Sequence, residues 1–89
     1  MIEVIFSEQF KKEYKRRIKI DKMKSKKFFN RLEMFIQDPF NPALQTHKLT
    51  GVLKNMWAFK VDYDLRVIFY FANDEKAIFV NIGTHNKVY

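Results

Sequence analysis

The sequence predicts an α+β domain in which a helical hairpin packs on one face of a mainly antiparallel, twisted sheet. Between residues 8 and 38 apolar residues recur at helical spacing, whereas from residue 57 onward they alternate with other residues as in strands. The chain has 89 residues, 47% of them hydrophobic, which is typical of one small domain with its own core. We therefore expect a single domain over residues 1–89 with the element order β-α-α-β-β-β.

The first half is expected to form a short strand followed by two helices. Apolar residues alternate within residues 2–6, and Ser7 is a suitable N-cap for the first helix. Residues 21–24 are expected to form the turn to the second helix, which ends at Asp38 because the following proline disfavours helical geometry there. The apolar stripes of the two helices comprise Phe10, Tyr14, Ile18, Phe28, Leu32, Phe35 and Ile36. Residues 39–50 contain two prolines and no periodic pattern, which predicts a loop.

The second half is expected to form three strands joined by hairpins. If residues 62–64 form the first loop, Phe59 lies opposite Val67 and Lys60 lies opposite Arg66. This register places the aromatic residues on one face of the sheet and two cations on the other. Asn73 and Asp74 are expected to form the second turn. Ile78, Val80 and Ile82 are the apolar positions of the last strand. Trp57 and the phenylalanines at strand spacing are expected in the core.

The chain is strongly basic, with 17 Lys and Arg against 10 Asp and Glu and a formal net charge of +7. This excess favours a polyanionic partner, nucleic acid first and an acidic protein segment second. The chain has no cysteine and only two histidines, so neither a metal nor another cofactor is expected. No apolar run approaches the roughly 20 residues that span a bilayer, so we expect no membrane association and a cytoplasmic location.

The side chains that remain for chemistry are His, Lys, Arg, Asp and Tyr, since no phosphate-binding glycine loop or nucleophile elbow occurs. Metal-free RNA cleavage needs an aligned 2′-hydroxyl, a base, an acid and cations that stabilise the phosphate charge. The Lys60–Arg66 pair fits this requirement. It also fits an ordinary solvated face, although like charges opposite each other cost stability unless an anion joins them. Both interpretations stay open on this evidence.

Three segments carry a resemblance to a known family: HKLTG at 47–51, WAFKVDYDLRVIF at 57–69 and NIGTHNKVY at 81–89. Together they resemble the RelE/ParE superfamily of type II toxin-antitoxin toxins, with the RelE and YafQ branch of mRNA interferases as the nearest. The resemblance implies a RelE-like fold over the whole chain. It also implies a ribosome-dependent endoribonuclease that cuts mRNA in the A site by metal-independent attack of the 2′-hydroxyl on phosphate, and a cognate antitoxin that wraps the toxin.

The resemblance further implies which residues act. Arg66 matches the arginine that stabilises phosphate charge on the middle strand, and Lys60 is its expected neighbour. His85, in the segment GTH, matches the catalytic histidine of the YafQ-like branch and is expected to act as general acid to the leaving 5′-oxygen. These three residues form the expected minimum set.

Three more positions match residues of the same branch. Tyr89 matches the C-terminal aromatic residue, which stacks on a base or assists proton transfer. His47 matches the histidine of the HPL-like loop motif and Asp64 an acidic residue, and either fits the role of base or of orienting one. The sequence departs from the branch at Asn81, where an arginine is usual, and it has no histidine between Trp57 and Arg66.

Two alternatives to the nuclease remain. A ParE-like toxin would inhibit DNA gyrase on the same fold, and a decayed toxin would only bind its antitoxin. The GTH segment with a terminal aromatic residue favours the nuclease, because a gyrase inhibitor needs no acid and no stacking residue near phosphate.

Overall fold

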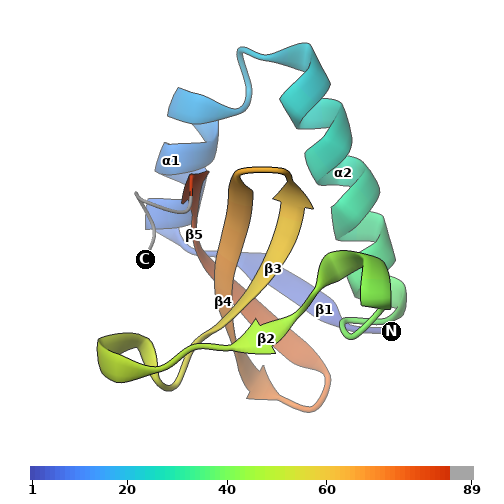
Figure 1. Cartoon of the computed structure of the whole chain (residues 1–89), viewed down its shortest axis with the longest axis vertical. Helices are drawn as coiled ribbons and strands as arrows, with labels where there is room; N and C mark the ends of the chain where they lie inside the picture. Colours follow the sequence, from blue (N-terminus) through green and yellow to red (C-terminus); the bar gives the residue numbers. More distant parts are fainter. Residues whose placement is uncertain (85–89) are drawn as a thin grey trace.

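The computed structural model describes residues 1–84 and places two helices against a five-stranded sheet (Figure 1). The sheet order is β1-β5-β4-β3-β2, in which β1 runs parallel to β5 and the other neighbours are antiparallel. This confirms the α+β class and the mainly antiparallel sheet. The elements are β1 (Glu3–Phe6), α1 (Glu8–Arg17), α2 (Lys22–Gln37), η1 (Pro42–Leu44), β2 (His47–Lys48), η2 (Gly51–Leu53), β3 (Trp57–Asp62), β4 (Leu65–Asn73) and β5 (Lys76–Thr84).

The predicted cap of the first helix is present and also joins α1 to the sheet. Ser7 Oγ accepts a hydrogen bond from the backbone N–H of Phe10 at 3.0 Å, which satisfies one unpaired donor of the helix start. The same hydroxyl donates to the carbonyl of Val80 in β5 at 3.2 Å. Ser7 therefore fixes where α1 leaves the sheet.

The turn predicted over residues 21–24 is wrong, because α2 already begins at Lys22. Asp21 is its N-cap, and the carboxylate accepts hydrogen bonds from the backbone N–H groups of Met23 at 3.0 Å and Lys24 at 3.1 Å. An aspartate in a polar stretch fits either a turn or a helix cap, and the apolar spacing begins too late to decide between them.

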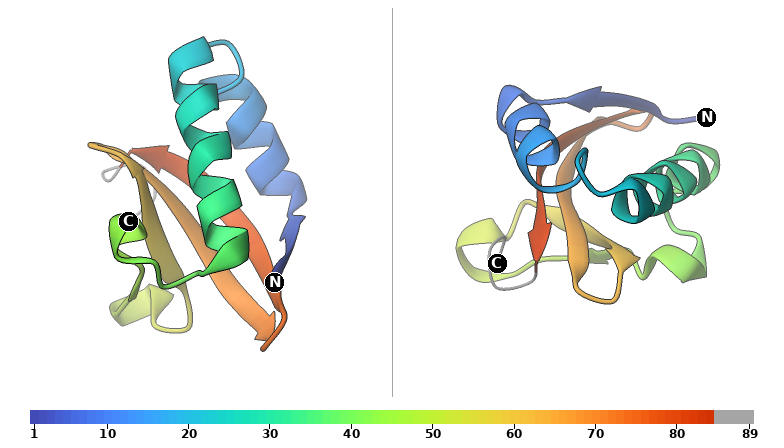
Figure 2. Two further views of the ribbon diagram at one scale, coloured as in Figure 1. Left: turned by 90° about the vertical axis from the view of Figure 1, so that its right-hand side faces the viewer. Right: turned by 90° about the horizontal axis from the view of Figure 1, so that it is seen from above.

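Phenylalanines from both layers are the largest side chains of the core, and both helices lie on the same side of the sheet (Figure 2). Phe35 of α2 is fully buried, with ring centroids 5.0 Å from Phe59, 4.9 Å from Phe69 and 5.2 Å from Phe79. Phe10 of α1 also packs on Phe79, at 5.5 Å. The sheet face that carries these rings is therefore the inner face, and we call the opposite one the open face.

The loop predicted over residues 39–50 is only partly correct. It contains η1 and the short strand β2, whose residues His47 and Lys48 pair with Ala58 and Trp57. The sheet thus has one strand more than the predicted order β-α-α-β-β-β. A strand of two residues is too short to show alternation, so the periodicity could not reveal it.

The register predicted for the first hairpin is confirmed, but its loop is shorter than predicted. Phe59 pairs with Val67 and Lys60 with Arg66. The three-residue loop is wrong because Asp62 already pairs with Leu65, and a bulge between Lys60 and Asp62 takes up the extra residue.

The second hairpin also turns later than predicted. Asn73 belongs to β4 and pairs with Lys76, and its side-chain oxygen accepts a hydrogen bond from the backbone N–H of Glu75 at 2.8 Å.

Within residues 1–84 no helix is long and apolar enough to cross a membrane.

Candidate functional site

Lys60 and Arg66 are direct cross-strand neighbours on the open face. Their strand neighbours Phe59 and Val67 are fully buried toward the helices, so strand alternation turns both cationic side chains the other way. Arg66 also pairs with Gly83 of β5, which has no side chain. The sequence prediction that two cations share this face is confirmed.

The guanidinium of Arg66 is held by the turn between β3 and β4. Its Nη1 donates to the carbonyls of Asp62 at 2.9 Å, Tyr63 at 3.2 Å and Leu65 at 3.3 Å. No other described residue hydrogen-bonds to this side chain, which leaves Nε and Nη2 available to an anion. The arginine is thus positioned by one nitrogen while it keeps donors for a phosphate.

His47 lies on the same face as the cationic pair. It pairs with Ala58, which is two positions before Lys60 on β3, so its side chain leaves the sheet on the side of Lys60. The ring is exposed, and its Nδ1 lies 2.9 Å from the carbonyl oxygen of Gln45. This contact orients the imidazole from within its own loop.

Asp64 lies in the turn between β3 and β4 and is exposed. Among residues 1–84 it has no hydrogen-bond or ion-pair partner, so the structure does not join it to Arg66 or Lys60. Its place in the turn also fits a residue chosen for turn geometry.

The two remaining predicted residues, His85 and Tyr89, lie outside the described residues. β5 ends at Thr84, which pairs with Leu65, and Gly83 pairs with Arg66. In the sequence His85 follows Thr84 directly. Among the residues that the structure describes, no cluster of three or more His, Asp or Glu side chains is arranged to hold a metal ion.

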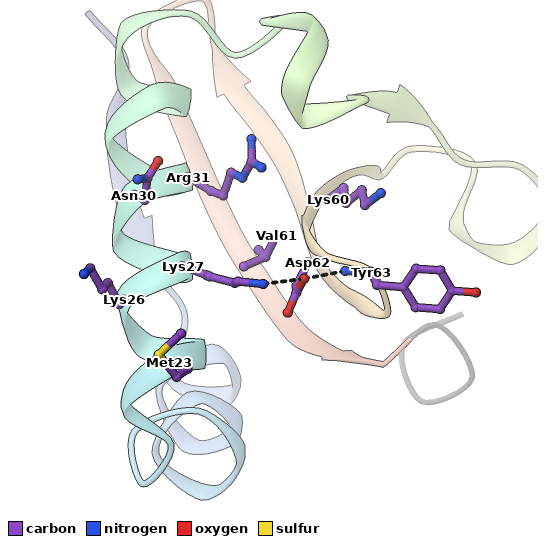
Figure 3. A pocket seen from close by; sticks show the side chains of 9 residues that line it. All are labelled: Met23, Lys26, Lys27, Asn30, Arg31, Lys60, Val61, Asp62 and Tyr63. Atoms are coloured by element: carbon purple, nitrogen blue, oxygen red, sulfur yellow. Dashed lines mark hydrogen bonds and ion pairs between the residues drawn. The ribbon is translucent and has the colours of Figure 1, made fainter.

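An ion pair that no sequence pattern predicted joins α2 to β3. Lys27 Nζ lies 2.9 Å from Asp62 Oδ1 (Figure 3). The hydrogen bond from Lys27 and a second one from the backbone N–H of Tyr63 hold the pKa of the Asp62 carboxyl below its ordinary value. The partners are 35 residues apart, so only the packing of α2 on the sheet brings them together.

The fold is that of solved bacterial toxins, among them the YoeB/ParE toxin from Agrobacterium tumefaciens, with a TM-score of 0.79 at 12% identity over 94% of this chain and 99% of that one. Residues 2–89 match the family described as "Bacterial toxin of type II toxin-antitoxin system, YafQ". Because this match covers nearly the whole sequence, the chain belongs to the YafQ family of type II toxins. A comparison with curated protein sequences gives no match.

Solved structures agree with this assignment. The crystal structure of YafQ from E. coli strain BL21(DE3) has a TM-score of 0.80 at 22% identity, covering 100% of this chain and 99% of that one. The E. coli DinJ-YafQ toxin-antitoxin complex has a TM-score of 0.72 at 25% identity over 99% and 97%. The YoeB-YefM complex from Staphylococcus aureus has 0.76 at 17% identity over 96% and 98%.

Proposed function

We propose that this toxin is a metal-independent endoribonuclease that cuts mRNA in the ribosomal A site and thereby inhibits translation. The observation that carries the proposal is the Lys60–Arg66 pair on the open face. Two cations held opposite each other outside the core cost stability unless an anion joins them, and a phosphate group is such an anion. A ribosomal target implies that the toxin acts in the cytoplasm.

The chemistry assigned to the site is an internal transfer. The 2′-hydroxyl of the RNA loses its proton to a base and attacks the adjacent phosphorus, and the bond from phosphorus to the 5′-oxygen breaks. The products are a 2′,3′-cyclic phosphate and a 5′-hydroxyl, which receives its proton from an acid. Arg66 and Lys60 stabilise the negative charge that develops on the phosphate oxygens. Because the RNA supplies its own nucleophile and these two side chains supply the positive charge, neither water nor a metal enters this step.

The proton-transfer roles follow the sequence resemblance. We assign the acid to His85 and the stacking of a base to Tyr89. His47 is the better candidate for the base or for orienting it, since its exposed ring shares the open face with Lys60, whereas Asp64 lies in the turn.

We also propose an antitoxin as the regulatory partner. Two of the similar structures are toxin-antitoxin complexes, DinJ-YafQ and YoeB-YefM. A chain with a net charge of +7 favours an acidic segment that folds as it binds and covers the surface needed for RNA.

The test is primer extension on a defined mRNA in a reconstituted translation reaction, with and without ribosomes. Wild type should cut within codons only when ribosomes are present, and His85→Ala should lower cleavage by roughly 100-fold or more because the acid is lost. The same preparations are then tested for inhibition of gyrase supercoiling. Inhibited gyrase with intact mRNA would establish the ParE-like function instead, and two negative results would indicate a toxin that only binds its antitoxin.

A further inference from the structure

A cationic cleft of about 510 Å³ lies between α2 and β3, on the other side of β3 from the open face (Figure 3). Its lining includes Lys26, Lys27 and Arg31 from α2 and Lys60 from β3, against a single carboxylate, Asp62. This volume falls within the range of ordinary ligand sites. The cleft therefore has a marked excess of positive charge, and of its cations only Lys60 takes part in the proposed cleavage chemistry.

The cleft exists because β2 covers only the beginning of β3. β2 pairs with Trp57 and Ala58, so the edge of β3 has no strand neighbour beyond Ala58 among the described residues. The buried contact of Phe35 with Phe59 fixes α2 beside this edge. Residues four apart share one face of a helix, which directs both Lys27 and Arg31 toward β3 (Figure 3).

The cations of the cleft are only weakly engaged within residues 1–84. Lys27 pairs with Asp62, but both side chains are substantially exposed, 49% and 37%. Arg31 Nη1 donates to the carbonyl of Ala43 at 3.5 Å and lies 3.8 Å from Met34 Sδ, both long contacts. Lys60 has no hydrogen-bond or ion-pair partner among the described residues and points away from α2 (Figure 3). Lys60 therefore borders both the cleft and the open face.

We propose that this cleft binds backbone phosphates of the same RNA strand that is cut at the open face, with Lys27 and Arg31 as the phosphate ligands. Lys60 lies between the two sites and makes them one continuous track over the free edge of β3. The proposal rests on the proposed function for the choice of RNA as the polyanion. Contacts of this kind position a strand without reading its sequence.

Asp62 has a defined part in this site. Its carboxylate pairs with the ammonium group of Lys27 when no RNA is bound. A phosphate that enters the cleft replaces this carboxylate as the partner of Lys27, so the ammonium group always has an anion beside it. An exposed ion pair contributes little to folding, so this exchange does not endanger the fold. Asp62 thus competes with RNA for Lys27, and its removal strengthens binding.

The test measures binding of the full chain to a fluorescent 2′-O-methyl RNA oligonucleotide by anisotropy over a range of salt concentrations. This RNA cannot be cut, because its 2′-oxygen is blocked. Lys27→Ala and Arg31→Ala should each weaken binding. Each should also make the fall of the logarithm of the association constant with the logarithm of the salt concentration less steep, by about 0.7. Asp62→Asn should bind more tightly than wild type. Lys76→Ala is the matched control, since Lys76 is also a half-exposed lysine with a carboxylate partner, Glu3 at 3.9 Å.

The outcomes separate the possible roles. If Lys27→Ala and Arg31→Ala behave like Lys76→Ala, the cleft does not bind RNA and the proposal is overturned. It is also overturned if Asp62→Asn weakens binding as Lys27→Ala does, because the ion pair would then only stabilise the local structure. A third contradicting result would be that Lys27→Ala and Arg31→Ala lose binding to a polyglutamate peptide but not to RNA. Thermal melting verifies that each variant is folded. A wild type that binds RNA with this pattern but leaves translated mRNA intact would contradict the proposed function alone.

Discussion

Arg66 shows why an arginine and not a lysine stands at the centre of the site. One guanidinium nitrogen reaches three carbonyls of the turn between β3 and β4, while no residue within 1–84 hydrogen-bonds to the other two nitrogens. A lysine carries its three donors on one nitrogen, so it cannot bind the turn through one nitrogen and present a planar pair of donors to a phosphate through others. The planar group thus combines fixed placement with donors of the geometry that a phosphate accepts.

Glu13 forms a hydrogen-bonded ion pair with Arg17 within α1. Its Oε1 accepts a hydrogen bond from Arg17 Nε at 2.7 Å, and its side chain is only 16% exposed. The bond from Arg17 lowers the pKa of the Glu13 carboxyl below its ordinary 4.5, against the opposing effect of burial.

This pair predicts a defined pH dependence of stability. A carboxyl with a lowered pKa in the folded state stabilises the fold above pH 4.5, and this contribution is lost as the pH falls through the lowered value. Glu13→Gln should therefore reduce the free energy of unfolding at neutral pH. In acid, the free energy of unfolding of this variant should decrease less with falling pH than that of wild type. Urea denaturation at several pH values measures both effects. Glu8→Gln is the control, because Glu8 is 94% exposed. Equal acid sensitivity of wild type and Glu13→Gln would contradict this account.

Among the elements, α2 makes its most central contact with the sheet through Phe35, in addition to the packing of Phe28 and the ion pair of Lys27 with Asp62. Phe35 contacts Phe59, Phe69 and Phe79 from three different strands, and it is fully buried. The same contact sets the separation between α2 and β3, and hence the cleft between them.

Phe35→Ala is expected to cost about 3–5 kcal/mol of unfolding free energy, since it leaves a cavity among three rings. Phe29→Ala, on the same helix but 53% exposed, should cost clearly less. Chemical denaturation of the two variants measures the difference. Similar losses in both would show that α2 is not anchored through Phe35.

The elements also show how far sequence reasoning extends. The strand alternation predicted that Phe59 faces Val67 and Lys60 faces Arg66, because a period of two fixes which residues share a face. The strand β2 was not predicted, because two residues are too few to show alternation. Asp21 was predicted to lie in a turn, whereas it is the N-cap of α2. The ion pair of Lys27 with Asp62 depends on how a helix packs on a sheet, and no local pattern encodes that distance.

In the molecule as a whole, a part of the positive charge lies on the two sides of β3. β3 carries Lys60 toward the open face, and its free edge faces Lys27 and Arg31 of α2. The phenylalanine core holds these two surfaces in a fixed relation. In our proposals, the open face cuts the RNA strand and the cleft anchors it.

If the open face around Arg66 cuts RNA, the cleavage rate of translated mRNA must depend on this arginine, and we would measure that rate for Arg66→Ala, wild type and Lys76→Ala. We predict that Arg66→Ala stays folded but loses about 2.7–4 kcal/mol of transition-state stabilisation, roughly a 100- to 1000-fold lower rate. Lys76→Ala should cut like wild type, since Lys76 lies at the start of β5 and pairs with Glu3 of β1. Wild-type cleavage by a folded Arg66→Ala variant would contradict the account, because Arg66 would then be no more than a surface charge that stabilises its turn.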